Sequence, residues 1–209
     1  MDYAAARKVM VDSQVRVNDV TDRTLQSALM AVPRERFCAP DQAFAAYGEV
    51  EVEIAAGRRL MQAREVSKLL QALDAREGER ALAIAAPYAA AVLAAMKVSM
   101  TAQEAEQAVL DVVGPALADA GVDVVAAPLT QPAGSDWDMI VSEGAVSVRP
   151  TTWLAALRVG GRLAVVERPG PNGRAVLYVK GREGVSRREL FDAAPPVLAE
   201  MTPAPVFAL

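Results

Sequence analysis

The residues best placed to take part in chemistry follow two strand-like runs. The apolar run Ala81–Ile84 is followed by a turn at Ala85–Ala86–Pro87 and then by an alanine-rich stretch typical of a helix. In α/β folds that bind nucleotide-type ligands, the ligand lies over such a turn, against the helix N-terminus. Glu143 directly follows a second run, Trp137–Ser142, at the edge where open parallel sheets place their ligands. The pattern therefore predicts a ligand site with a carboxylate beside it.

The predicted turn lacks the residues that such a site normally uses. Ligand-binding turns usually contain glycine, because their backbone takes positive φ angles and approaches the ligand without a Cβ atom in the way. No glycine occurs between Gly78 and Gly114, and Pro87 has no N–H to donate. We expect the Cβ atoms of Ala85 and Ala86, with a short bend, to fill the ligand space. The alternative is a different turn that still admits the ligand.

The composition excludes several kinds of chemistry. The chain has no histidine and a single cysteine, Cys38, which removes histidine-based nucleophile systems, the usual zinc ligand sets and an intrachain disulfide. No acidic cluster has the spacing of a site for hard cations, so no metal site is predicted. Cys38 is expected to be a small buried apolar residue, with a reactive thiol as the alternative.

Charge and hydropathy indicate the expected compartment of the protein and which classes of partner are excluded. The net charge of −4 and the isoelectric point near 5.0 argue against nucleic acid as a partner. The longest apolar runs are broken well short of the ~20 residues of a membrane span, and the charged N-terminal segment does not look like a signal peptide. A single cysteine suits a reducing compartment. We therefore expect a cytoplasmic protein with no membrane or nucleic-acid partner.

The elements that must position these residues alternate from residue 80 onward. Strands are expected over 81–84, 97–102, 122–126, 137–142, 162–167 and 174–180, and helices over 87–96, 104–120 and 151–157. Gly160–Gly161 is expected to end the last of these helices, and residues 184–191 to pair with 174–180 as a hairpin. This alternation predicts an α/β fold with a mostly parallel sheet and antiparallel strands at its end.

The N-terminal part is expected to be mainly helical. Helices are predicted over 2–17, 22–31 and 62–73, a loop with a short helical turn over 33–49, and a strand or hairpin arm over 50–57. Asp19 or Thr21 is the expected cap of the second helix. No linker or repeat divides the chain, so we expect one domain, 1–209, with an N-terminal region over 1–75 and a sheet core over 76–209. The apolar tail, 194–209, should fold over the body or meet another subunit.

Several segments together resemble the protein-L-isoaspartate O-methyltransferase family, especially its bacterial branch. They are MVDSQVRVNDVTDRTLQSAL and MAVPRERFCAP within 10–40, AYGE at 46–49, WDMIVSEGAV at 137–146 with Pro150, and LRVGGRLAVV at 157–166. The VPRERF loop is fairly specific, whereas GGRL is common among methyltransferases. The resemblance implies a Rossmann-like S-adenosylmethionine methyltransferase fold with N-terminal helices. It also implies methyl transfer to the α-carboxylate of isoaspartyl residues in damaged proteins.

The resemblance assigns roles to particular positions, and this sequence departs from the family at most of them. The family's glycine turn corresponds to ALAIAAPYAA, which has no glycine and is about two residues shorter. The acid that holds the ribose hydroxyls corresponds to Glu104, and the aspartate near the adenine is replaced by Pro128 or Leu129. With the residue at the end of the fourth strand, the candidate cofactor-binding positions are Ala85, Ala86, Pro87, Tyr88, Glu104 and Glu143.

On the acceptor side, the family has a Thr-Ile-Ser-Gln-Pro segment whose serine belongs to the acceptor site. This sequence reads Arg59-Leu60-Met61-Gln62-Ala63, so Met61 corresponds to the serine and Gln62 lies next to it. A thioether neither activates nor strongly binds a carboxylate. Met61 is therefore expected to fill the core or the pocket, and no catalytic residue is assigned.

Structural alternatives remain for the charged and aromatic candidates. Glu104 could be a solvated residue that starts a helix, and Glu143 could cap the Gly144–Ala145 turn. Residues 34–36, Arg-Glu-Arg, could serve the acceptor, but a surface ion-pair cluster is favoured. Trp137 and Trp153 are expected to pack in the core.

Two hypotheses for the function follow. In the first, the protein is an isoaspartate-type methyltransferase of reduced or altered activity. In the second, it is a non-catalytic member that serves as an interaction, scaffold or dimerisation module, with a protein, a peptide or a second copy as its partner. The lost glycines and the lost acceptor serine argue against tight binding of S-adenosylmethionine and against full activity.

Overall fold

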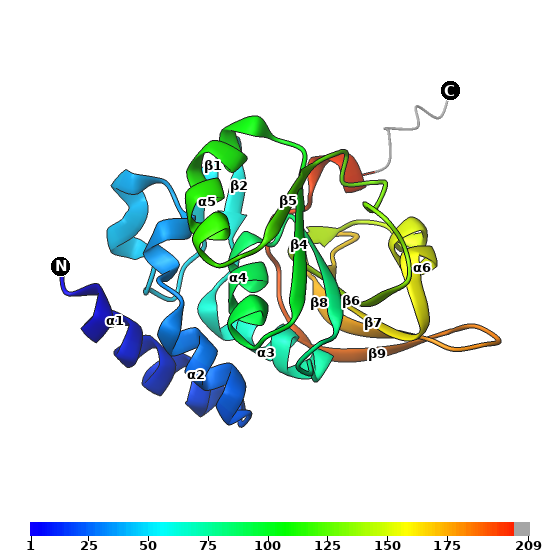
Figure 1. Cartoon of the computed structure of the whole chain (residues 1–209), viewed down its shortest axis with the longest axis horizontal. Coiled ribbons are helices and arrows are strands. Elements are labelled where there is room, and N and C mark those ends of the chain that lie inside the picture. Colours follow the sequence, from blue (N-terminus) through cyan, green and yellow to red (C-terminus); the bar gives the residue numbers. More distant parts are fainter. Residues whose placement is uncertain (203–209) are drawn as a thin grey trace.

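A sheet of seven strands forms the centre of the molecule (Figure 1). The computed structural model describes residues 1–202, and the strands are β3 (Arg80–Ile84), β4 (Ser99–Glu104), β5 (Asp123–Ala126), β6 (Trp137–Val146), β7 (Leu157–Glu167), β8 (Arg174–Lys180) and β9 (Val185–Asp192). Their order in the sheet is β5-β4-β3-β6-β7-β8-β9. Strands β3 to β7 pair in parallel, and β8 and β9 are antiparallel. The predicted fold class is confirmed.

Helices cover one face of the sheet, and a shorter layer covers the other. The first face carries α3 (Ala63–Leu73), α4 (Pro87–Ala95) and α5 (Gln107–Asp119), and the second carries α6 (Thr151–Ala156) and the C-terminal segment. Side chains alternate between these layers: in β3, Ala83 belongs to the helical face and Leu82 to the opposite one. Strands buried on both faces explain the continuous apolar runs of the sequence.

The N-terminal region packs against α3, α4 and α5 (Figure 1). Its elements are α1 (Tyr3–Met10), the π-helical turn η1 (Val11–Val15), the 3-10 turn η2 (Arg16–Asn18), α2 (Arg23–Ala31), the 3-10 turns η3 (Arg34–Phe37) and η4 (Pro40–Ala45), and the hairpin strands β1 (Val52–Ala55) and β2 (Arg58–Leu60). The predicted helices and the hairpin arm are present. The cap of α2 is Asp22, whose Oδ1 accepts from two backbone N–H groups of the first turn, rather than Asp19 or Thr21.

Two strands differ from their predicted bounds in ways that affect the site. Strand β4 covers 99–104 instead of 97–102, because Lys97 takes a left-handed conformation (φ 64°) after α4 and delays the strand. As a result, Glu104 ends a strand and does not begin a helix. Strand β6 continues to Val146, beyond the predicted end at 142, so Glu143 lies within it, next to an irregularity in its pairing with β7.

The predicted helix stop at Gly160–Gly161 is wrong. Helix α6 ends at Ala156, and both glycines lie inside β7. Gly160 has a φ of 83°, so it accommodates an irregular stretch at the start of the strand. A Cβ atom at position 161 would lie 2.7 Å from the Trp137 carbonyl oxygen, so this glycine allows the two strands to approach closely.

The C-terminal segment folds over the body as far as it is described. Val197 forms a parallel bridge with Ala145 of β6, and Leu198 and Met201 are buried in the second core layer, where the 3-10 turn η5 (Ala199–Met201) ends the described chain. The remainder of the predicted tail, 203–209, lies outside the described residues. No helix of residues 1–202 is long and apolar enough to cross a membrane.

Candidate functional site

The turn after β3 keeps the backbone shape that favours glycine, although it contains none. Ala85 is left-handed, with a φ of 49°, and its N–H donates to the Gln103 carbonyl oxygen at 3.0 Å. Ala86 precedes α4, and Pro87 is the first residue of the helix. The left-handed conformation costs an alanine about 1 kcal/mol, and both alanines are 2 % exposed. The turn is therefore maintained by its surroundings rather than by its own sequence.

Very little space remains between this turn and the neighbouring strand and helix. A cavity of about 10 Å³ is lined by the turn, by Gln103 and Glu104 of β4, and by apolar side chains of α5. A space of this size holds about one water molecule. Sites for small organic ligands measure about 300–1,000 Å³. The methyl groups at positions 85 and 86 and the apolar face of α5 fill the rest.

Glu104, the predicted ribose ligand, is held by an arginine that the sequence analysis missed. Arg58 of β2 donates to both carboxylate oxygens, from Nε at 3.0 Å and from Nη2 at 2.8 Å. Glu104 Oε1 also accepts from the backbone N–H groups of Ala105 and Glu106 at 2.8 and 3.2 Å. The carboxylate is 6 % exposed and accepts hydrogen bonds at both oxygens, so it is not solvated. Nothing in the local sequence indicated that the β1–β2 hairpin reaches β4.

Glu143 lies at the N-terminus of α4, where a bound anion would be expected. Its Oε1 accepts from the Ala89 N–H at 2.8 Å, and the backbone N–H groups of Tyr88 and Met61 also stabilise its charged form. Burial nevertheless raises the pKa of this carboxyl group, and the Arg34 guanidinium and these N–H groups oppose the rise. The predicted alternative, a cap on the Gly144–Ala145 turn, is wrong because the side chain caps α4 instead.

Arg34 is completely buried beside Tyr88, and its positive charge acts on Glu143. Its Nε donates to the Ala46 carbonyl oxygen at 2.8 Å, its Nη2 donates to the Met61 carbonyl oxygen, and its guanidinium lies 4.7 Å from the centre of the Tyr88 ring. We refer to Arg34, Tyr88 and Glu143 as the Arg34 cluster. Burial raises the pKa of the Tyr88 hydroxyl well above its usual range.

The surface ion-pair cluster predicted for residues 34–36 is wrong for two of its three members. Arg34 has no exposed surface, and the Glu35 carboxylate is largely buried, where it accepts from the Tyr47 hydroxyl and pairs with Arg7. Only Arg36 forms an exposed pair, with Asp119 at 2.8 Å. Trp153, by contrast, is in the core as predicted, and Cys38 is buried.

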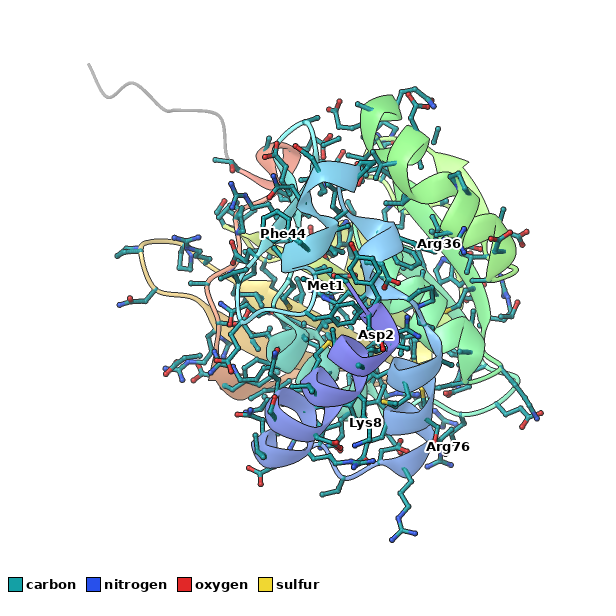
Figure 2. The ribbon with its side chains drawn as sticks, turned by 90° about the vertical axis from the view of Figure 1, so that its left-hand side faces the viewer. Met1, Asp2, Lys8, Arg36, Phe44 and Arg76 are labelled. Atoms are coloured by element: carbon teal, nitrogen blue, oxygen red, sulfur yellow. The ribbon has the colours of Figure 1, made fainter. Side chains whose placement is uncertain are left out.

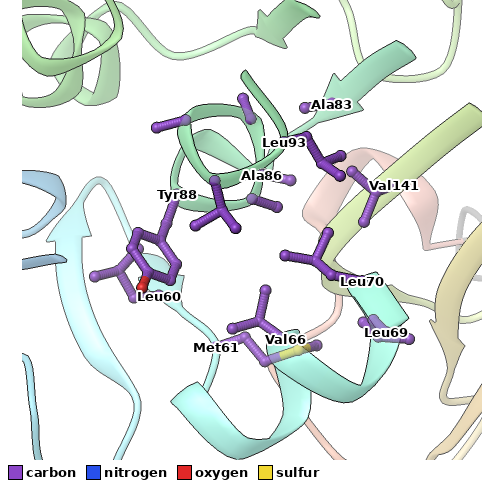
Figure 3. Packing of buried hydrophobic residues seen from close by; sticks show 14 of the residues in the cluster. Leu60, Met61, Val66, Leu69, Leu70, Ala83, Ala86, Tyr88, Leu93 and Val141 are labelled. Atoms are coloured by element: carbon purple, nitrogen blue, oxygen red, sulfur yellow. The ribbon is translucent and has the colours of Figure 1, made fainter. Parts of the chain in front are cut away.

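Met61 is a core residue with 1 % exposure, and its backbone joins two parts of the site. Figure 3 shows it with Val66 and Leu70 on the α3 side of the core, facing Tyr88 and Ala86 on the α4 side. Its carbonyl oxygen accepts a hydrogen bond from Arg34, and its N–H stabilises the charged form of the Glu143 carboxyl group. Gln62 precedes α3 without a side-chain cap bond and receives a long contact from Arg64.

The structure thus divides the predicted positions into two groups on either side of the start of α4. The turn residues 85–87 and Glu104 line the 10 Å³ cavity. Tyr88, Glu143 and Met61 surround the Arg34 side chain. Leu129, one of the two positions predicted to replace the family's aspartate, is fully buried, and its carbonyl oxygen accepts from the Trp153 indole at 2.7 Å.

The sheet order, the antiparallel β8 and β9, and the turn–helix arrangement at β3–α4 define a Rossmann-like methyltransferase fold. Two solved structures share it. One, titled as a protein-L-isoaspartate O-methyltransferase, has a TM-score of 0.77 at 17 % identity over 92 % of this chain and 66 % of that chain. The other, from Plasmodium falciparum and titled as a putative protein-L-isoaspartate O-methyltransferase in complex with S-adenosyl-L-homocysteine, has a TM-score of 0.78 at 14 % identity over 93 % and 98 %.

Sequence comparison defines the family within this fold. The model of protein-L-isoaspartate(D-aspartate) O-methyltransferase matches residues 6–190. A protein-L-isoaspartate O-methyltransferase of Methylorubrum extorquens is 34 % identical, covering 93 % of this chain and 87 % of its own, and one of Methylorubrum populi is 32 % identical, covering 91 % and 92 %. The chain belongs to the protein-L-isoaspartate O-methyltransferase family.

Proposed function

We propose that this protein is a family member in which S-adenosylmethionine binding and methyl transfer are weak or lost. The observation that supports the proposal best is the 10 Å³ cavity at the turn after β3. An adenosyl group needs far more room, and the Cβ atoms of Ala85 and Ala86 lie where a glycine turn would leave space. The Arg58–Glu104 pair adds to this, because it engages the carboxylate expected to bind the ribose.

Calorimetry tests the proposal directly. We expect no heat of binding when S-adenosylmethionine is titrated to about millimolar concentration, because at that concentration even weak specific binding of about 4 kcal/mol is measurable. No methyl group should be incorporated into an isoaspartyl peptide. The Methylorubrum extorquens relative, measured in parallel, controls for the quality of ligand and peptide. Micromolar binding by this protein would contradict the proposal.

A double variant separates the missing glycines from the remaining obstacles. We expect Ala85→Gly/Ala86→Gly to fold, since glycine tolerates the left-handed φ at position 85. We do not expect it to bind S-adenosylmethionine, because Arg58 still engages Glu104 and the bend is shorter than in the family. Recovery of micromolar affinity in this variant would show that the side-chain methyl groups alone close the site.

A second candidate function, an interaction module, is favoured by the N-terminal surface. Five large apolar side chains of residues 1–50 are at least half exposed: Met1, Val9, Val17, Phe44 and Val50. Figure 2 looks onto this region, with Met1 and Phe44 labelled. Exposed apolar residues are common singly, and those that join into one patch are typical of contact surfaces. A protein, a peptide or a second copy is the proposed partner, in the cytoplasm.

Light scattering tests this candidate for the second copy. A dimer that Phe44→Ser converts to a monomer would support it. A wild-type protein that stays monomeric at about 100 μM, a concentration at which contacts weaker than about 5 kcal/mol stay dissociated, would contradict the homodimer.

A further inference from the structure

Helix α4 begins in the core without a cap of the usual kind. Its preceding residue, Ala86, has no side-chain acceptor, and its first residue, Pro87, has no N–H. The next two N–H groups, of Tyr88 and Ala89, are buried and have no partner inside the helix. Buried N–H groups need an acceptor, and the acceptor for the Ala89 N–H is Glu143 of β6, more than fifty residues away in the sequence.

The surroundings of the Glu143 carboxyl group supply donors and positive charge, which oppose the rise that burial causes in its pKa. The N-terminus of α4 provides two N–H groups with the positive end of the helix dipole. Met61 provides a third N–H from the β2–α3 junction. Arg34, whose guanidinium remains charged in proteins, acts on the carboxyl group from η3. Three chain segments thus direct donors or positive charge at the carboxyl group of Glu143.

Unpartnered polar atoms in the same place indicate more binding capacity than one side chain uses. Among the described residues, Arg34 Nη1, Tyr88 Oη and Glu143 Oε2 are buried and have no hydrogen-bond partner. Arg34 is 0 %, Tyr88 0 % and Glu143 1 % exposed. A buried donor without an acceptor is costly. Two unpartnered donors, Arg34 Nη1 and Tyr88 Oη, and one unpartnered acceptor, Glu143 Oε2, are typical of a site built around a polar group.

We propose that the N-terminus of α4, whose Ala89 N–H donates to Glu143, and the buried Arg34 form a site for a carboxyl group, the α4 anion site, which the chain's own Glu143 occupies. The inference deepens the proposed function, on which it rests, because the site lies at the helix N-terminus where a ligand of this fold would meet α4. The chain supplies the carboxylate in cis, so an external one has no access. Removal of the Glu143 side chain should leave a vacant site that accepts a small carboxylate.

Chemical rescue with formate tests the proposal. Glu143→Ala should lower the melting temperature by about 10 °C, because it leaves buried N–H groups and Arg34 without an acceptor. Sodium formate at about 100 mM should restore at least half of the loss, because a ligand that binds only the folded state stabilises it. Sodium chloride at equal concentration should not, and the wild type should not respond to formate.

Two variants serve as matched controls. Glu143→Gln keeps a side-chain oxygen at the site, so it should be insensitive to formate. Glu65→Ala removes another buried glutamate, 5 % exposed and also with an unpartnered Oε2, that has no backbone N–H donor. Formate should not rescue it. Rescue of Glu65→Ala to the same degree, or equal effects of formate and chloride on Glu143→Ala, would overturn the proposal.

Other outcomes are also decisive. If Glu143→Ala does not fold, its refolding from urea is compared with and without formate, and an unchanged yield overturns the proposal. A melting temperature equal to that of the wild type overturns it too. Binding of S-adenosylmethionine by the wild type would overturn the proposed function while formate rescue still succeeded. If formate fails to rescue Glu143→Ala and the wild type does not bind S-adenosylmethionine, the anion site is contradicted and the proposed function still holds.

Discussion

At the scale of single residues, the site is defined by buried charges that find their partners far away in the sequence. Arg58 reaches Glu104 across 46 positions, and the Ala89 N–H reaches Glu143 across 54. Each pairing satisfies a group that would be costly to bury alone. The stability of this region therefore depends on partners that only the fold brings together.

The Arg58–Glu104 pair can be tested by removing the arginine. Arg58→Ala leaves the Glu104 carboxylate largely buried with only its two backbone N–H donors, and we expect a loss of about 3 kcal/mol in the free energy of unfolding. Arg36→Ala is the control, because it breaks an exposed pair with Asp119 and should cost about 0.5 kcal/mol or less. Urea unfolding measures both. Equal losses would contradict the structural role of Arg58.

At the scale of elements, the position of α4 depends on the strands and turns that meet its N-terminus. Strand β6 supplies Glu143, η3 supplies Arg34, and the β2–α3 junction supplies Met61. On the other face of the sheet, the C-terminal segment lies along β6, with Leu198 donating its N–H to the Ala145 carbonyl oxygen at 2.8 Å. Strand β6 thus joins the Arg34 cluster to the end of the described chain.

Gly144 allows the C-terminal segment to approach β6 closely. A Cβ atom at this position would overlap the side chain of Leu198, which is 2 % exposed. We expect Gly144→Ala to cost about 2 kcal/mol, because the buried segment would have to move. Gly170→Ala is the control, since a Cβ atom there has no neighbour within 4 Å. Thermal unfolding compares them, and a Gly144→Ala protein as stable as the control would contradict this packing.

At the scale of the whole molecule, acidic groups are distributed unevenly between core and surface. Burial raises the pKa values of three glutamates: Glu51, Glu65 and Glu143. The pKa of Asp138 is lowered by the Arg80 N–H and by Arg158. The pKa of Asp12 is lowered by its hydrogen bond from the Lys8 ammonium group. The groups with raised values bind a proton more tightly in the folded state, so they favour folding at low pH. The groups with lowered values favour folding above their usual pKa of 3.8.

The sign of the pH dependence follows. Above the usual glutamate pKa of 4.5, the free energy of unfolding should fall as the pH rises through the raised values of the buried glutamates. We expect greater stability near pH 5 than near pH 8 in urea unfolding, because the buried glutamates bind a proton more tightly in the folded than in the unfolded state. Glu143→Gln and Glu65→Gln should each reduce the slope. A wild-type protein more stable at the higher pH would contradict this.

The sequence by itself determined the fold class, most element positions and the family. Apolar runs that alternate with helical patterns predict a parallel sheet, because the strands of such a sheet are buried on both faces and must be apolar throughout. The absence of glycine between residues 78 and 114 can be seen directly in the sequence. The predicted bounds of β8 agree with the structure to the residue. Errors of a few residues arose where a left-handed residue such as Lys97, or a close approach such as that at Gly161, overrides the local pattern.

Only the tertiary structure decided what the charged residues do. The sequence around Arg34, in the VPRERF loop, is typical of an exposed ion-pair cluster, but in the fold this side chain is fully buried. Nothing in the sequence near Arg58 indicates that it pairs with Glu104. Glu143 was predicted to follow a strand that ends at residue 142, but it lies within β6, and its role as an acceptor for α4 depends on which helix end lies beside it. The physical reason is that hydrogen-bond and charge partners are set by distances in space, whereas periodicity records only neighbours along the chain.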